Sequence, residues 1–242
     1  MIGIIGKKIG MTQIVGPAGD LVPVTVLQAG PVTVTKVLTK SKEGYDAIQV
    51  GFEDAKEKQL SRVQIKAFQK NQIKPKRILK EFRFNRVGKA SEYKVGQELA
   101  AGVFEEGEFV DIQGKTIGKG FQGVIKRWGM KGGPGSHGSM HHRRLGSAGA
   151  SSFPSRTWPG HHMPGHMGDE LKTVQNLLIM RVLKEDNAIV VRGAVPGAKN
   201  AILVIRKSFK REKIDLNQLK ATPKGGQGKD GAKKTAKKPI RK

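Results

Sequence analysis

The chain has 242 residues, of which 45 are Lys or Arg and 20 are Asp or Glu, so its formal net charge is +25. A charge this one-sided indicates a polyanionic partner, either nucleic acid or an anionic membrane surface. No apolar run approaches the roughly 18 residues of a membrane span, which excludes a membrane-embedded protein. The absence of cysteine excludes disulfides and Cys-based zinc sites, and no signal peptide is recognisable, so we expect a cytoplasmic protein.

The first half of the chain is typical of short strands separated by turns rich in Gly and Pro. In residues 32–38, Val32, Val34, Lys36 and Leu38 alternate with the intervening residues, which is the pattern of a half-buried strand. Further strands are expected at residues 2–5, 11–15, 21–28 and 47–52. Strands at this spacing favour an antiparallel barrel or a sandwich.

Residues 57–80 break the strand pattern and predict a small helical insert. Ser61 is a suitable cap for a helix in which Val63, Ala67 and Phe68 share one face. Pro75 suits the first turn of a second short helix at residues 76–80, because proline is tolerated there.

Strand patterns resume after the insert and continue on both sides of a glycine-rich stretch. We expect strands at residues 82–86, 109–112, 124–126, 174–182, 188–192 and 202–205. Residues 1–127 plus 168–209 are therefore predicted to form one β-barrel domain, and residues 128–167 a long loop that leaves this domain and returns to it. Residues 210–242 form a basic tail of low complexity, which we expect to be disordered.

Residues 112–168 contain no Asp and no Glu. The same window holds all six histidines, both tryptophans, fourteen glycines and eight Lys or Arg residues. A carboxylate beside phosphates is repelled, whereas Lys and Arg displace counterions and stabilise the contact. The composition therefore predicts that a polyanion lies against this window.

Gly118, Gly120 and Gly123 match the dinucleotide-binding GxGxxG pattern. We reject that interpretation, because no helical periodicity follows and the next acidic residue is Asp169, too far along the chain to hold a ribose. A glycine-rich turn near a phosphate fits better, with lysines and arginine to neutralise charge. A plain glycine-rich turn with solvated lysines remains open.

The histidines at positions 137, 141, 162 and 166 have the i, i+4 spacing of some metal sites. Gly138 and Pro164 interrupt the two pairs, and no Cys, Asp or Glu nearby completes a coordination shell, so we predict no metal. Ser136 and His137 have no local carboxylate to orient a base, so we predict no enzyme. Trp128 either anchors the base of the loop on the barrel or packs against nucleotides, and Trp158 is the better candidate for packing against nucleotides.

Several motifs resemble the large-subunit ribosomal protein L-three family in its bacterial form. The family's signature begins at Phe104 and continues through Asp111, Gly114, Thr116, Gly118 to Gly120, Gly123 and Arg127, with every position filled. The stretches 136–139, 142–143, 146–149, 159–160 and 163–168 resemble its central loop. Residues 3–12 resemble its N-terminus and residues 193–197 its last barrel turn, so the resemblance covers about residues 1–207.

The resemblance implies a mainly β fold: an antiparallel, translation-protein-like β-barrel with a small helical insert and a long extended loop. It implies a structural protein that binds 23S rRNA early in subunit assembly, near the 3′ end of that RNA, beside neighbouring ribosomal proteins. It implies no cofactor, no small-molecule substrate and no membrane partner. A DNA-organising or generic basic binding protein is the alternative, and it would not need the loop.

Two sets of residues follow from the acid-free window and the resemblance. The expected rRNA-binding residues are Lys115, Lys119, Lys126, Arg127, Lys131, His137, His142, Arg143, Arg144, Arg156, Trp158, His162 and His166. The expected loop tip, near the peptidyl-transferase centre, contains Arg144, Gly146, Ser147, Gly149, Ala150, Ser151, Ser152 and Pro154. Some bacterial members carry a methylated glutamine where this chain has Ala150, so we predict no such modification here.

Overall fold

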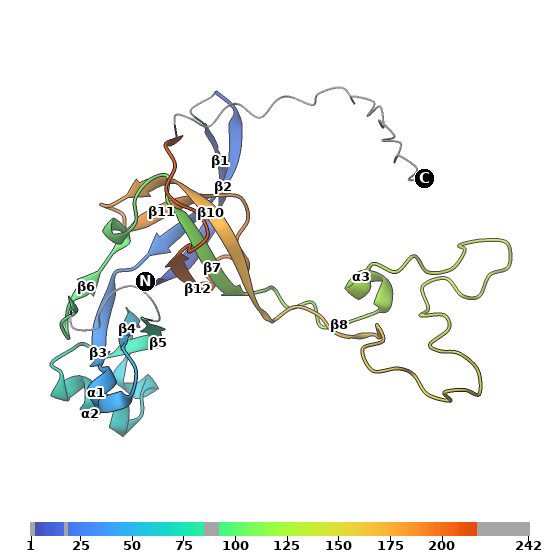
Figure 1. Ribbon diagram of the computed structural model, residues 1–242, viewed down its shortest axis with the longest axis horizontal. Helices are drawn as coiled ribbons and strands as arrows, with labels where there is room; N and C mark the ends of the chain where they lie inside the picture. The colour runs from blue at the N-terminus through green and yellow to red at the C-terminus, as the bar shows by residue number, and fades with distance from the viewer. Residues whose placement is uncertain (1–2, 17–18, 85–91, 217–242) are drawn as a thin grey trace, which may run out of the picture.

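A computed structural model describes residues 3–16, 19–84 and 92–216. Six strands pair antiparallel in the order β1-β12-β7-β10-β11-β2, and β2 pairs back with β1 to close a barrel (Figure 1). Their bounds are Gly3–Val15 for β1, Leu21–Ala29 for β2, Phe109–Lys115 for β7, Leu171–Leu183 for β10, Ala188–Arg192 for β11 and Ile202–Lys207 for β12.

A second sheet with the order β5-β4-β3-β6 adjoins the barrel. Its strands are β3 (Val32–Leu38), β4 (Ala47–Asp54), β5 (Lys76–Arg83) and the short β6 (Glu98–Leu99). The connections between strands include the helices α1 (Lys40–Glu43) and α2 (Arg62–Lys70) and the 3₁₀ turns Glu57–Gln59 and Ala101–Val103. Ser61 begins α2 with a capping box, because its hydroxyl accepts from the Gln64 amide while the Gln64 side chain accepts from the Ser61 amide.

One hydrophobic core joins the two sheets. Ile4, Ile112, Ile189 and Ile205 fill the barrel and are fully buried, and they belong to the same cluster as the second sheet's Val50. Burying such side chains is the main stabilising contribution to the fold, at roughly 1.5–3 kcal/mol each. The prediction of a mainly β protein is confirmed, and the strands predicted at 32–38 and 188–192 have these bounds in the structure. The half-buried pattern expected for 32–38 is wrong, because residues 32–35 are buried on both faces of the strand.

Two local predictions are wrong. Residues 76–80 belong to strand β5, not to a helix, because they pair with β4 in a register that runs from Ala47↔Arg83 to Asp54↔Lys76. Residues 124–126 belong to a short helix, α3 (Val124–Trp128), not to a strand. In both places tertiary contacts override a local preference. The proline before β5 favours the start of a helix, and the β-branched residues of α3 favour a strand.

The start of the predicted tail lies against the barrel. The Ile214 amide donates to the Gly107 carbonyl at 3.0 Å, Lys213 forms an ion pair with Glu105, and Leu216 packs on a small cluster that contains Met180. The remainder of the predicted tail, 217–242, and the end of the strand predicted at 82–86 lie outside the described residues. In the part of the chain that the structure describes, no helix is long and apolar enough to cross a membrane.

Replacing Ile112 by alanine should lower the free energy of unfolding by about 2–5 kcal/mol, because Ile112 is fully buried in the barrel. Ile117 is 59% exposed, and its replacement by alanine should change that free energy by no more than about 0.5 kcal/mol. Urea denaturation of the two variants measures both. Equal losses would contradict the placement of the core.

Candidate nucleic-acid interface

The loop leaves the barrel on a two-stranded stem. β7 and β10 are neighbours whose register ends at Lys115↔Leu171. Beyond it, the Thr116 amide donates to the Glu170 carbonyl, and the Lys119 amide to the Met167 carbonyl, each at 2.9 Å. The stem ends in two short strands, β8 (Phe121–Gln122) and β9 (Gly165–His166), which pair antiparallel. The barrel's hydrogen bonding therefore continues into the loop, which extends to one side of the barrel (Figure 1).

Gly168 allows the two limbs of the stem to approach closely. Its φ is +76°, a left-handed conformation that favours glycine, and a Cβ atom there would overlap the carbonyl oxygen of Ile117. The same Cβ would lie 3.1 Å from the Cα atom of Gly118. Backbone packs directly on backbone at this point, so position 168 accepts no side chain without displacing the stem.

Helix α3 ties the outgoing limb to the returning limb. The Arg127 guanidinium and the Trp128 indole both donate to the Met163 carbonyl, at 2.8 and 3.0 Å. Trp128 also stacks on His162, with ring centroids 4.1 Å apart and planes 8° from parallel. Trp128 thus anchors the loop, as expected, but its partner is the returning limb and not the barrel.

A second turn inside the loop packs around His141. The Gly133 amide donates to the His142 carbonyl at 2.7 Å, and a Cβ at Gly133 would lie 2.7 Å from Cδ2 of His141. The His141 ring is half-buried and faces Gly146 on its other side. His141 was not among the expected rRNA-binding residues, and its role here is to fill the turn.

The loop has no hydrophobic core. Within residues 115–177, all of which the structure describes, Val124 alone is buried. Of the thirteen expected rRNA-binding residues, all are exposed except Arg127, which is half-buried against Met163 and Gly165. Of the expected tip residues, all are exposed except the half-buried Pro154. The expected side chains are therefore spread along one extended segment and do not converge on a pocket.

The positive charge of the loop is not compensated within it. Lys115 forms an ion pair with Asp169 at 2.8 Å, and this hydrogen bond holds the pKa of Asp169 below its usual value. The other seven Lys and Arg residues of the window form no salt bridge with any residue that the structure describes. Cations exposed without acidic partners, on a segment without a core, suit contact with closely spaced phosphates.

Exposed apolar side chains accompany these cations. Phe153 is 87% exposed, and Trp158 is 59% exposed with the Arg156 guanidinium 5.2 Å from the centre of its ring. Flat side chains of this kind can stack on unpaired bases. Phe153 was not among the expected rRNA-binding residues. Its place in a glycine-rich segment could have indicated its exposure, since such a segment offers few apolar neighbours to cover an aromatic ring.

The described residues of the loop form neither a metal-binding cluster nor a dinucleotide-binding unit. Among the described residues, no three His, Asp or Glu side chains gather closely enough to hold a metal ion. The i, i+4 histidine pairs do not lie on helices, because α3 ends before the first of them. A helix does follow the GxGxxG stretch, against expectation, but α3 is five residues long and follows the two-residue strand β8. The long βαβ unit of a dinucleotide site is not formed by these residues.

A family model and individual similar proteins both match this chain, and both belong to the same family. A family model described as Ribosomal protein L3 matches residues 82–189. The Large ribosomal subunit protein uL3 of Brachyspira hyodysenteriae is 46% identical over 219 residues, which cover 90% of this chain and 100% of that protein. The Large ribosomal subunit protein uL3 of Brachyspira pilosicoli is also 46% identical over 219 residues, with 90% and 99% covered.

Replacing Gly168 by alanine should open the stem, because the added methyl group overlaps the Ile117 carbonyl. We expect faster hydrogen exchange at the amides of Lys119 and Met167, with the barrel amides unchanged. Gly135 is the matched control, since a Cβ there would meet no atom within 4 Å. Protected stem amides in the Gly168→Ala variant would contradict the geometry.

Replacing Lys115 by methionine should raise the pKa of Asp169 towards its ordinary value, because the hydrogen bond from Lys115 holds it down. The contribution of this pair to stability is present above the usual carboxyl pKa and is lost as pH falls through the lowered value. NMR titration of the Asp169 carboxyl carbon in both proteins measures the change. An identical titration in the two proteins would show that the ion pair does not form.

Proposed function

The chain belongs to the ribosomal protein L3 family, and on this premise we propose that it is a structural constituent of the large ribosomal subunit that binds 23S rRNA directly through residues 112–168. One observation carries the proposal: from Lys115 to Gly168 this segment is acid-free, Val124 is its one buried residue, and seven of its cations have no acidic partner among the described residues. Contact with phosphates stabilises such a segment, because the phosphates neutralise its positive charge.

The barrel serves as the platform for this contact. In this proposal the predicted domain, residues 1–127 with 168–209, lies at the subunit surface in its barrel part, and its residues 116–127, which form the outgoing limb of the stem and most of α3, carry the predicted loop, residues 128–167, into the RNA. Because β7 and β10 are fixed by the core, the stem leaves the barrel in a defined direction. The glycines of the loop allow its backbone to pass through narrow gaps between RNA helices.

The distal part of the loop approaches the peptidyl-transferase centre in this proposal. Residues 144–154 lie farther along the chain from the stem than α3 and are exposed, apart from half-buried Leu145, Ala148 and Pro154. They contain Arg144 but no acidic residue and no nucleophile beside a carboxylate. The tip therefore performs no catalysis in this proposal, and it supports a site at which RNA performs the chemistry.

The protein binds early in assembly, near the 3′ end of the 23S rRNA, and neighbouring ribosomal proteins then pack around it. The alternative is a generic basic protein that organises DNA. The 46% identity over nearly the whole length of the two relatives favours the ribosomal function. Competition between structured rRNA fragments and duplex DNA separates the two, since a generic binder would show no preference for the RNA.

Binding to 23S rRNA fragments should weaken steeply with salt. Contact with about 8 phosphates predicts a slope of log affinity against log salt of roughly −6 to −7. Replacing Lys119, Lys131 and Arg143 by glutamine should make that slope shallower by about 2 to 3, roughly one for each lost phosphate contact. Filter binding at several salt concentrations measures both values.

The matched control replaces three exposed lysines outside the loop, Lys42, Lys94 and Lys184, by glutamine. This variant has the same net charge as the loop variant, so any general effect of charge is shared by the two. A slope near −1 for the unmodified chain, or equal changes in the two variants, would contradict binding through the loop.

A further inference from the structure

The hairpin formed by β1 and β2 extends beyond the barrel (Figure 1). β1 pairs with β12 only over Gly3–Lys7, and β2 pairs with β11 only over Val24–Gln28. In the distal part, Met11–Val15 forms a ladder with β2 and with no other described strand. Exposed strand edges of this kind are normally covered or blunted with charge, because they otherwise pair with other chains.

The outer face of the distal hairpin is exposed, uncharged and mostly apolar, with Gln13 as a polar residue between Met11 and Val15. Met11, Val15 and Leu21 are 53%, 62% and 65% exposed. The cross-strand pairs Val15↔Leu21 and Gln13↔Pro23 lie on this face, since paired residues share a face and alternate with the inward pair Ile14↔Val22. A contiguous exposed apolar face in a monomer marks an interaction site.

This face carries no charge in a chain that is otherwise strongly basic. From Ile9 to Thr35 there is no Lys or Arg, although 45 of the 242 residues are basic, and Asp20 is the one acidic residue. Every exposed residue described in this stretch is uncharged. Phosphates would find no cation here, so the face is unsuited to RNA, whereas burial against an apolar surface stabilises it.

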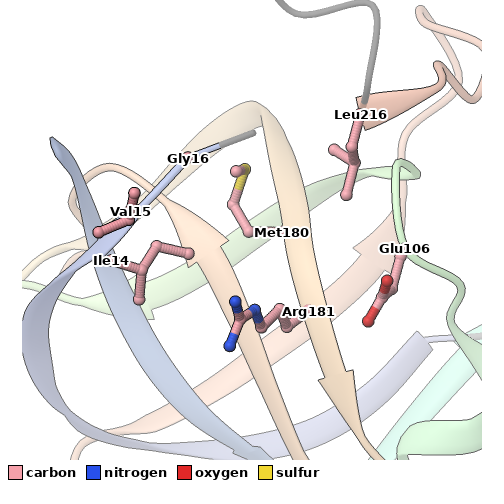
Figure 2. A pocket seen from close by; sticks show the side chains of 7 residues that line it. All are labelled: Ile14, Val15, Gly16, Glu106, Met180, Arg181 and Leu216. Carbon is pink, nitrogen blue, oxygen red and sulfur yellow. The ribbon is translucent and has the colours of Figure 1, made fainter. Parts of the chain in front are cut away.

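A pocket lies between the end of β1 and β10. It measures about 360 Å³ and is lined by Ile14, Val15, Gly16, Met180 and Leu216, together with Glu106 and Arg181. Figure 2 shows the two hairpin residues Ile14 and Val15 on one side of Met180, and Leu216 and Glu106 on the other. A large apolar side chain would fit among Ile14, Met180 and Leu216, with Glu106 and Arg181 available for a polar contact.

We propose that the distal hairpin, Met11–Val15 with Leu21–Pro23, docks on another protein of the large subunit, one that presents an uncharged apolar surface. The inference rests on the proposed function. A second copy of this chain is disfavoured, because two chains of charge +25 repel each other. The chain's own residues 217–242 are also unsuited, since they contain nine Lys or Arg and only Leu219 and Ile240 as large apolar residues.

Photocross-linking tests the partner directly. A photoreactive phenylalanine analogue is placed at Leu21 of the full chain, and the chain is assembled into large subunits and irradiated. We expect a covalent product with one defined protein of the subunit. A product with rRNA, with a second copy, with the chain's own residues 217–242, or no product at all would overturn the proposal.

A competition experiment tests the energetics. The double variant Val15→Gln/Leu21→Gln and the control Val63→Gln/Val95→Gln, in which both valines are exposed outside the hairpin, each compete with the unmodified chain for incorporation into large subunits. The hairpin variant should be under-represented on the order of tenfold, since two buried apolar contacts are lost. The control should be incorporated equally, and equal incorporation of the two variants would overturn the proposal.

Binding to isolated 23S rRNA separates this inference from the proposed function. Both double variants keep every cation, so their affinity for the naked RNA should equal that of the unmodified chain. A loss specific to the hairpin variant would show that the hairpin contacts RNA and would overturn the proposal. Failure of the unmodified chain itself to bind the RNA would instead overturn the proposed function.

Discussion

The pairing of β7 with β10 is the constraint on which the rest of the structure depends. The two strands are neighbours in the barrel, and the chain leaves at the end of one and returns at the start of the other. The loop between them has no core, so nothing within it can fix its direction. Buried residues such as Ile112 and Ile179 fix the two strands in the barrel core. The stem continues these strands, so its direction, and that of the segment with the cations, is set by the barrel.

The chain separates its charges along the sequence as well as in space. Residues 112–168 lack acids, and residues 9–35 lack bases. Most of the first stretch forms an exposed loop on one side of the barrel (Figure 1), and most of the second forms a hairpin with a mostly apolar outer face. In our account the loop faces phosphates and the hairpin faces protein. A single small domain can in this way join RNA to the protein layer of a large assembly.

Much of the fold could be predicted from the sequence, because short runs rich in Val and Ile between Gly and Pro turns mark strands, as at Val32–Leu38 and Ala188–Arg192. The alternation read at 32–38 did not predict burial, since residues 32–35 are buried on both faces. Two segments could not be predicted correctly in this way. Pro75 locally favours a helix at residues 76–80, but pairing with β4 makes them a strand. Val124 and Ile125 locally favour a strand, but the contacts of α3 with Met163 accompany a helix there. A stem for the loop was expected from the resemblance, but its backbone pairing was not predicted, because the paired residues lie about fifty positions apart.

Composition identified the candidate interface, but it could not separate residues that face solvent from those that pack within the loop. His141 and Arg127 look equivalent to their neighbours in the sequence, yet His141 fills the turn and Arg127 joins the two limbs. Their role follows from non-local contacts with glycines and with Met163, which no local pattern reports.

Hydrogen exchange on the free chain and on its complex with 23S rRNA tests the central claim most directly. We predict that the amides of residues 128–164 exchange rapidly in the free chain and become strongly protected on the RNA, because few of them have hydrogen-bond partners within the loop. The barrel amides should be protected in both states. Protection gained on the barrel, with the loop amides unchanged, would contradict the account.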